Sequence, residues 1–404
     1  MSTDTIRLAD RMRHIGLSPT MKGTIEAERL RRQGVDVVDL GAGEPDFPTP
    51  AFITAAAHAA LDAGFTKYTA NMGTAELREA VVARYQQDYG VRYQPDEVII
   101  TAGGKQALFH AAFALFQPGD EVIVHTPGWP TLTEQIKLAG ATPVPVRTRI
   151  EEGFALKAPA LLAAVTPRTR GLVINSPGNP TGALLSEVDA RALAAEAARR
   201  DLWVIIDLCY ERLIYDDVPH NLPAIFGDAM RDRLVLAGSA SKAYAMTGWR
   251  CGWAVAAKPV IQAANALQSH STSNVNSITQ KAAAAALTGP QQCVSDMLRE
   301  YQRRRDQTLA WLAEEPRLRC AVPQGAFYLF PDVSDFLSPD RHRTSLDFSD
   351  ALLKHEHVVT TAGEAFDAPG FLRLSYATSL DRLREGVTRL IRFARSMRVG
   401  DGGR

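Results

Sequence analysis

The feature that most constrains the fold is a series of short apolar runs, each followed by polar or glycine-rich residues and then by a segment of helical character. Residues 97–101 are rich in β-branched side chains and lead into a glycine pair, while residues 202–206 deliver Asp207. Regular alternation of strand and helix is typical of a parallel, doubly wound α/β sheet, whose ligands bind at the carboxyl ends of the strands. We therefore predict a large α/β domain with its site along that edge. Further strands are predicted at 35–40 and 172–175, and Ser186 with Asp189 three residues later predicts the start of a helix that runs to about residue 200.

Composition excludes several classes of partner. The 404 residues include 45 Lys plus Arg and 45 Asp plus Glu, so no net charge attracts nucleic acid or an anionic membrane. The sequence holds no apolar run long enough for a membrane span, and its charged N-terminus lacks a signal-peptide core. Four scattered cysteines without C-x-x-C spacing indicate a reduced, cytoplasmic protein with no metal site.

One lysine stands out at the end of the apolar run 234–237. Lys242 follows Gly238-Ser239-Ala240-Ser241, and a lysine among small residues at a strand end is a candidate Schiff-base nucleophile. The same letters spell S-x-x-K, a serine-acylation signature, but its S-D-N and K-T-G partners do not occur. A surface lysine after a turn is the third interpretation.

Two further strand ends carry groups with chemical potential. Gly103 and Gly104 lie between a strand and a helix, where free backbone N–H groups and the positive helix end favour an anion. Asp207 is carried by an apolar strand into the same edge as Lys242, which suits the partner of a buried cation, although a helix or turn cap would also explain it.

The stretch 238–250 resembles the Schiff-base region of the class I and II aminotransferases, which are pyridoxal-phosphate (PLP) enzymes of fold type I. The resemblance extends over about residues 7–395, and it implies that Lys242 binds the cofactor. Asp207 would face the pyridine nitrogen, with Lys242, Asp207 and Tyr210 as the catalytic group. The other positions that the resemblance assigns to the cofactor are Gly103, Gly104, Lys105, Trp129, Asn179, Tyr210, Ser239, Arg250 and, from the second subunit of a homodimer, Tyr68.

The resemblance also implies a substrate side. Arg373 matches the arginine that binds the substrate α-carboxylate, and Gly43 would face the substrate together with Trp129 and Asn179. In one branch of the family an arginine grips a second carboxylate, but Ser269 stands at that place here. A second branch uses a Ser-x-Thr pair, which Ser18 and Thr20 match. Lys22 could supply the missing charge or simply be solvated, whereas His110 and His270 are candidates near the pocket without an assigned role.

These matches imply an N-terminal segment at 1–46 that joins a small domain, a large PLP-binding domain at 47–290, and a small α+β domain at 291–404. The expected activity is transfer of the amino group of a dicarboxylic or aromatic L-amino acid to a 2-oxo acid such as 2-oxoglutarate. A PLP-dependent lyase, cyclase or synthase is the alternative on the same fold. A ligand-sensing module of a transcription regulator would need a DNA-binding domain, for which about 35 residues before the first strand are too few.

Overall fold

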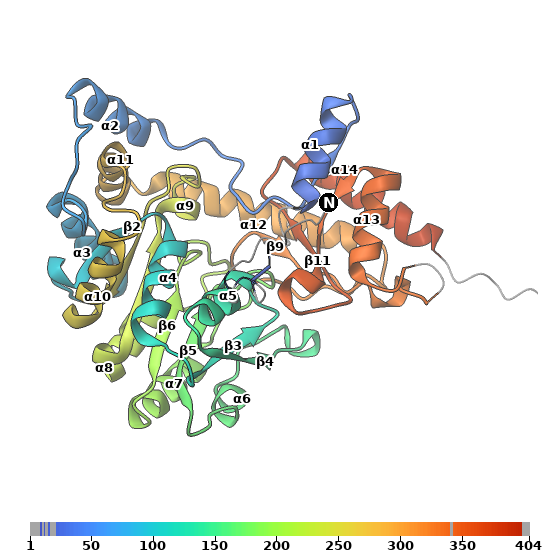
Figure 1. The fold of residues 1–404 in the computed structure, drawn as a ribbon. Helices are drawn as coiled ribbons and strands as arrows, with labels where there is room; N and C mark the ends of the chain where they lie inside the picture. Colours follow the sequence, from blue (N-terminus) through green and yellow to red (C-terminus); the bar gives the residue numbers. More distant parts are fainter. Residues whose placement is uncertain (1–8, 10–11, 13–14, 17–21, 340–341, 398–404) are drawn as a thin grey trace, which may run out of the picture.

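The computed structural model describes residues 9, 12, 15–16, 22–339 and 342–397, with the side chains of 22–25 left out. Its centre is a seven-stranded sheet, which lies between helices on both faces (Figure 1). In spatial order the strands are β2 (Val98–Thr101), β8 (Gly252–Ala256), β7 (Leu234–Ser239), β6 (Trp203–Asp207), β5 (Thr169–Asn175), β3 (Glu121–Thr126) and β4 (Thr142–Arg147). Only β8 runs antiparallel to its neighbours, so the predicted, mostly parallel doubly wound sheet is confirmed.

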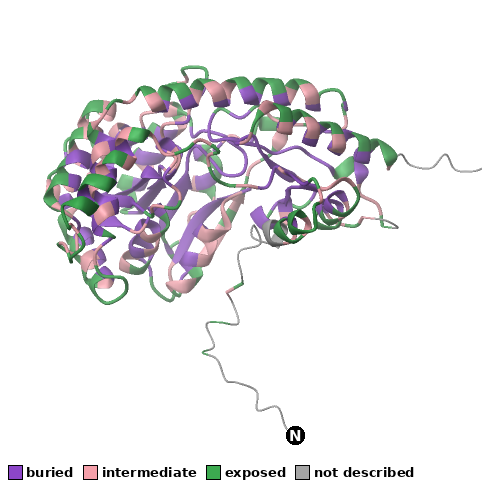
Figure 2. Ribbon diagram, turned by 90° about the horizontal axis from the view of Figure 1, so that it is seen from above, coloured by how far each residue is buried: buried purple, intermediate pink, exposed green. Residues whose placement is uncertain are grey.

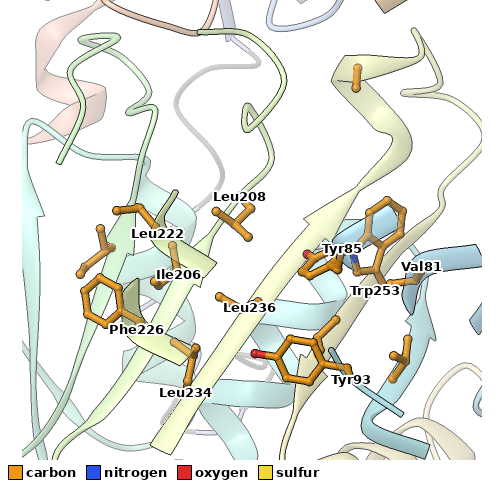
Figure 3. Packing of buried hydrophobic residues seen from close by; sticks show 14 of the residues in the cluster. Val81, Tyr85, Tyr93, Ile206, Leu208, Leu222, Phe226, Leu234, Leu236 and Trp253 are labelled. Atoms are coloured by element: carbon orange, nitrogen blue, oxygen red, sulfur yellow. Dashed lines mark hydrogen bonds between the residues drawn. The ribbon is translucent and has the colours of Figure 1, made fainter. Parts of the chain in front are cut away.

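The strands form because their apolar side chains are buried on both faces, as in parallel sheets generally. In β7, Leu234 and Leu236 join one core cluster while Val235 and Ala237 join another, which is the alternation that a strand imposes. Figure 3 shows Leu234 and Leu236 beside Ile206 and Phe226 in the first cluster. Figure 2 shows the buried strands enclosed by helices whose outer faces are exposed.

Helices cover the two faces separately. One face packs against α4 (Gly104–Leu115), α5 (Pro130–Leu138) and α10 (Lys258–Ser269). The opposite face packs against α2 (Ala51–Asp62), α3 (Ala75–Tyr89), α6 (Ala158–Ala163), α7 (Glu187–Arg199), α8 (Leu222–Met230) and α11 (Ser277–Thr288). As predicted, Ser186 caps α7, its hydroxyl accepting a hydrogen bond from Asp189 N.

A second, smaller sheet lies beside the C-terminal helices. Strands β11 (Thr361–Ala362), β12 (Leu372–Ser375) and β9 (Tyr328–Leu329) form it in antiparallel pairs. Around it lie α12 (Gln292–Leu312), α13 (Ser345–Glu356), α14 (Leu380–Ser396) and α1 (Lys22–Arg32). The predicted strand at 35–40 is shorter than expected, because only β1 (Val38–Asp39) pairs, in parallel with β10 (Val358–Val359).

A connecting segment, residues 40–50, runs from β1 beside the smaller sheet to α2 on the far side of the molecule (Figure 1). It is not merely a linker, because it forms hydrogen bonds with both parts. Leu40 O accepts a hydrogen bond from Ser375 N at 2.7 Å, and Thr49 Oγ1 donates to Ala245 O at 2.7 Å. This segment passes the edge of the large sheet where the predicted site residues lie.

Candidate active site

The carboxyl ends of the parallel strands bring the predicted cofactor residues together. Thr101, Asn175, Asp207 and Ser239 each end a strand of the sheet. Asn175 pairs with Asp207 across β5 and β6, so these two side chains lie at the same level on one face. Strand β7 ends at Ser239, one residue later than the predicted end at Gly238. Lys242 follows within the single helical turn α9 (Ala240–Ala243).

A cradle of small residues and one cation lies where β2 leads into α4. Gly103 has φ +83°, and a Cβ added there would come within 2.5 Å of Arg250 Nη2. A Cβ on Gly104 would lie 3.4 Å from Ser239 Cβ. The guanidinium of Arg250 is held over this turn by hydrogen bonds to Ala102 O at 3.2 Å and Thr247 O at 2.8 Å. Backbone N–H groups, a hydroxyl and a cation thus converge where a phosphate group fits.

Asp207 is a buried carboxyl with its own environment. Its side chain belongs to a residue that is 2% exposed, and Oδ1 accepts one hydrogen bond, from Cys209 N at 3.0 Å. Burial raises the pKa of Asp207 to about 6, and the hydrogen bond from Cys209 and the charge of Lys242 only partly oppose this. A buried carboxyl of this kind is suited to a cationic partner such as a protonated ring nitrogen.

Lys242 reaches from α9 toward the connecting segment. Its Nζ donates a hydrogen bond to Gly43 O, and it lies 5.8 Å from the ring centre of Tyr210 and 5.6 Å from that of Phe327. The Tyr210 hydroxyl in turn shares a hydrogen bond of 2.7 Å with Tyr328 OH. The amine is therefore enclosed by aromatic rings, and the partner it binds in this structure is a neutral carbonyl.

Arg373 comes from the smaller sheet, on β12, and is 3% exposed. Its hydrogen bonds go to Asn179 Oδ1 at 3.1 Å, Gly41 O at 2.8 Å and Thr361 Oγ1 at 3.4 Å. None of these acceptors is charged, and Nε has no partner among the described residues. A buried guanidinium held only by neutral oxygens has the character of an anion site, because a buried charge requires compensation.

Trp129 precedes α5 and Lys105 lies in the first turn of α4. Lys105 Nζ is 5.0 Å from the centre of the Trp129 ring. Burial lowers the pKa of Lys105, and the charges of Arg250 and Lys242 lower it further. Both residues border a cavity of about 630 Å³ whose wall also includes Thr126 and Phe366. Phe366 also lies 5.1 Å from the Arg373 guanidinium, although neither Arg373 nor Lys242 is among the residues that border the cavity.

Several predicted residues lie apart from this cluster. Tyr68 is 91% exposed in a loop before α3. His270 is an exposed residue that ends α10, whereas His110 is buried on α4 and bonds to Gln268. Ser18 and Thr20 lie outside the described residues, and Lys22 begins α1 with its side chain not described.

Sequence reasoning missed part of the site. Gly41, Thr361 and Tyr328 all contact Arg373 or Tyr210, yet none has a motif of its own. Asn175 was missed although it ends a predicted strand; its Oδ1 accepts the backbone N–H of Asn179 at 2.8 Å and so fixes the loop. Within the described parts of the chain, no group of three or more His, Cys, Asp or Glu could hold a metal ion.

These residues fit PLP by their chemistry. The cradle of Gly103, Gly104, Ser239 and Arg250 suits its phosphate, the buried Asp207 suits its ring nitrogen, and Lys242 lies on the same edge as the amine to hold its aldehyde. A strand-edge site of this kind on a doubly wound sheet defines a PLP-dependent enzyme of fold type I.

Comparison with known proteins identifies the family. The sequence model of the family described as aminotransferase class I and II matches residues 35–390. Aspartate/prephenate aminotransferase of Cereibacter sphaeroides is 41% identical over 392 residues, which are 96% of this chain and 98% of that protein. Aspartate aminotransferase of Geobacillus stearothermophilus is 40% identical over 388 residues, with coverages of 96% and 99%. The chain therefore belongs to the class I and II aminotransferases.

Solved structures agree with this assignment. Aspartate aminotransferase of Rhizobium meliloti has a TM-score of 0.91 at 39% identity, covering 97% of this chain and 99% of that one. Thermus thermophilus aspartate aminotransferase with maleate has a TM-score of 0.90 at 39% identity, with coverages of 96% and 100%. The protein is a PLP-dependent aminotransferase that uses an amino acid and a 2-oxo acid, and the predicted class, cofactor and fold are confirmed. The lyase, cyclase and synthase alternatives are correspondingly disfavoured.

Proposed function

We propose that the enzyme transfers the amino group of a dicarboxylic L-amino acid, such as aspartate or glutamate, to a 2-oxo acid such as 2-oxoglutarate, with aromatic amino acids as a second donor class. The observation that carries this proposal is the buried Arg373, whose acceptors are all neutral oxygens. A planar guanidinium can bind a carboxylate through two hydrogen bonds, which fixes the orientation of the substrate Cα.

The cofactor would be held from three directions. Gly103, Gly104, Ser239 and Arg250 would bind its phosphate, and Asp207 its ring nitrogen. Asn179 and Tyr210 would bond its phenolic oxygen, and Trp129 would stack on its ring. When bound, PLP supplies an electron sink for the substrate Cα. A charged Asp207 keeps that sink effective, because a carboxylate favours the protonated ring nitrogen.

Lys242 is the proposed proton carrier. With cofactor and amino acid bound, its Nζ would remove the proton of the substrate Cα and return it during transfer. The hydrogen bond to Gly43 O, together with the nearby rings of Tyr210 and Phe327, limits where this amine can move. Arg373 and Asn179 are bonded to each other, so the carboxylate and cofactor contacts are coupled through one pair of side chains.

Lys105, which the sequence assigns to the cofactor site, is in addition our proposed contact for the second carboxylate of the substrate. Its amine lies beside Trp129 and is close enough to Lys242 and Arg250 for their charges to lower its pKa. An anion at this point would reduce that repulsion. Ser18 and Thr20 remain predicted contributors, and the solved Thermus thermophilus relative with maleate is consistent with a dicarboxylate-binding site.

The cavity beside Trp129 favours a second candidate acceptor, a 2-oxo acid with a ring and a further carboxylate. Its volume of about 630 Å³ exceeds what aspartate requires, and the Phe366 and Phe109 rings provide apolar wall while Lys105 provides a cation. Two relatives at 40–41% identity are named aspartate/prephenate aminotransferases, one of them only as probable. Prephenate is therefore proposed as an additional acceptor.

The proposed active unit is a homodimer in which Tyr68 reaches the phosphate cradle of the partner. An open cavity of about 920 Å³ lies beside Arg250 and is bordered by Ala102, Thr272 and Asn274. The large side chain of Tyr68 is 91% exposed, and a recess of this kind on the partner subunit would bury it. The three-part division at residues 46 and 290 also stays a prediction.

A cytoplasmic location is proposed because all four cysteines are free, as expected in a reducing compartment. Among the helices that the structure describes, none has both the length and the apolar character needed to cross a membrane.

The test is a panel of half-reactions. The PLP-loaded enzyme is mixed with each amino acid in turn, the absorbance of the bound cofactor is followed, and the 2-oxo acid product is identified. Aspartate and glutamate should convert the cofactor fully, and Lys105→Gln should raise their KM about tenfold or more while leaving that of alanine unchanged. Lys258→Gln, a change at an exposed residue of α10 that does not border the cavity, serves as the control. Conversion by none of the dicarboxylic or aromatic donors would refute the proposal.

A further inference from the structure

The loop that carries Tyr68, residues 66–74, combines an exposed tip with a firmly held base. Tyr68 is 91% exposed, yet the loop ends at Gly73, where an added Cβ would come within 2.3 Å of the Ile100 side chain. On the other side, Phe65 O accepts a hydrogen bond from Ser277 Oγ at 2.8 Å. Both ends of the loop are thus fixed to the large domain.

Gln268 holds the middle from α10. Its side chain is completely buried, and Nε2 donates to Asn71 O at 2.7 Å and to Ile100 O at 3.0 Å. The remaining acceptor, Oε1, lies 3.3 Å from His110 Nε2. Since the amide nitrogen is used by two carbonyls, His110 must donate its Nε2 proton, and this contact fixes the orientation of the amide.

Gln280 holds the loop from α11 and is also completely buried. Its Oε1 accepts the backbone N–H of Thr74 at 2.8 Å, and its Nε2 donates to Thr69 Oγ1 at 3.0 Å, one residue after Tyr68. Nε2 also donates to Val275 O at 2.7 Å. Asn265, on α10, adds a third amide by accepting from Asn71 Nδ2 at 2.6 Å.

Burying a side-chain amide costs free energy unless each of its polar atoms is hydrogen-bonded, and here two buried amides contact the same loop. Packing alone does not need them, because an apolar side chain of the same length would fill the space, although it would leave the backbone groups that the amides bond without these partners. What the amides add is direction: they fix the backbone on both sides of Tyr68 while its ring stays exposed. Such preorganisation lowers the entropy that the tip would lose on binding.

We propose that Gln268 and Gln280 are positioning residues that aim Tyr68 at the phosphate site of a second copy of the chain. The inference rests on the proposed homodimer and on the proposed role of Tyr68. Neither glutamine touches the cofactor or the substrate; both act through the loop. Loss of either amide therefore weakens cofactor binding in the partner subunit, although the phosphate cradle itself is unchanged.

The test uses the full-length dimer and the isosteric variants Gln268→Met and Gln280→Met. Cofactor-free enzyme is titrated with PLP, and the dissociation constant is read from the absorbance of the bound cofactor. We expect each variant to bind PLP about three- to tenfold more weakly, the effect of losing about one hydrogen bond. Gln262→Met, an exposed glutamine on the same helix α10, should leave the constant unchanged. Sedimentation and melting temperature establish that each variant is a folded dimer.

A double-mutant cycle with Tyr68→Phe separates this inference from the proposal on which it rests. If the glutamines act through Tyr68, Gln268→Met should add little to the loss caused by Tyr68→Phe. A weakened Tyr68→Phe with unchanged methionine variants would overturn the inference alone. An unchanged Tyr68→Phe would refute the role of Tyr68 and the inference with it. If neither methionine variant folds, Asn265→Ala, at a half-buried position, carries the same expectation and the same refutation.

Discussion

The two halves of the proposed active site are built in different ways. The cofactor half comes from the ends of neighbouring strands in one sheet: Asp207 is placed by backbone pairing of β6 with β7, and Ser239 by pairing of β7 with β8. The substrate half is assembled from β12 of the smaller sheet and from the connecting segment, which contribute Arg373 and Gly41. The difference indicates that the cofactor half is rigid by construction, whereas the substrate half depends on how the two parts of the molecule meet.

Lys242 belongs to both halves, and its loss should have the largest effect. Lys242→Ala should lower kcat by more than about 100-fold, because removing a general base typically costs 10²–10⁴. The variant should also lose the visible absorbance of cofactor bound through the lysine, which a spectrum records. Lys258→Ala, at an exposed lysine paired with Asp96, is the control. Wild-type activity in Lys242→Ala would refute the assignment.

Asp207 tests the cofactor half by pH. Its pKa is about 6 in the folded protein and about 3.9 when unfolded, so the folded state binds more protons between these values. Stability of the cofactor-free protein therefore falls as pH rises from about 4 to 6, by roughly 3 kcal/mol for a shift of two units. Asp207→Asn removes this contribution, so the variant should become more stable than wild type above pH 6.

The measurement is the free energy of unfolding of both cofactor-free proteins at several pH values. Glu211, whose pKa burial raises to about 7, titrates in both proteins, so their difference removes most of its contribution; the charge of Asp207 is only a minor cause of the Glu211 shift. A difference that stays constant from pH 4 to 7 would show that the carboxyl of Asp207 is solvated. In the loaded enzyme Asp207→Asn should retain PLP yet lose most activity.

Arg373 tests whether the substrate half is independent of the cofactor half. Arg373→Lys should lower kcat/KM roughly 10- to 100-fold, because an ammonium cannot reproduce two parallel hydrogen bonds to a carboxylate. The PLP dissociation constant should change much less than kcat/KM, because Arg373 bonds to none of the cradle residues and reaches the proposed cofactor contacts only through Asn179. Equal losses of cofactor and substrate affinity would show that the two halves of the site are not independent.

Gly103 provides the reverse experiment, with the smallest expected effect. Gly103→Ala places a methyl group within 2.5 Å of Arg250 Nη2 and should weaken PLP binding about tenfold, with little change in the KM of the donor once the enzyme is loaded. Gly34→Ala is matched for strain, because φ is +81° there but nothing lies within 4 Å. Equal PLP affinities for the two alanine variants would mean that the cradle accommodates the added methyl group without loss of PLP binding.

The sequence alone determined those parts of the protein that depend on neighbours along the chain. Apolar runs with a polar end predicted the strands and placed Asp207 and Lys242 at one edge, since a buried strand must alternate its side chains between two cores. Capping chemistry predicted the start of α7 at Ser186. The roles given to Arg250 and Tyr210 required the family resemblance, because neither residue has a local signature of its function.

Only the tertiary structure decided which distant segments complete the site. Lys242 bonds to Gly43 across 199 residues and Arg373 to Gly41 across 332 residues, and both acceptors are backbone carbonyls, which every residue possesses. Gln268 and Gln280 look like ordinary helical glutamines until the loop they hold is placed against them. Periodicity records which face of an element is buried, but it carries no information on the element that buries it; that choice depends on the packing of the whole chain.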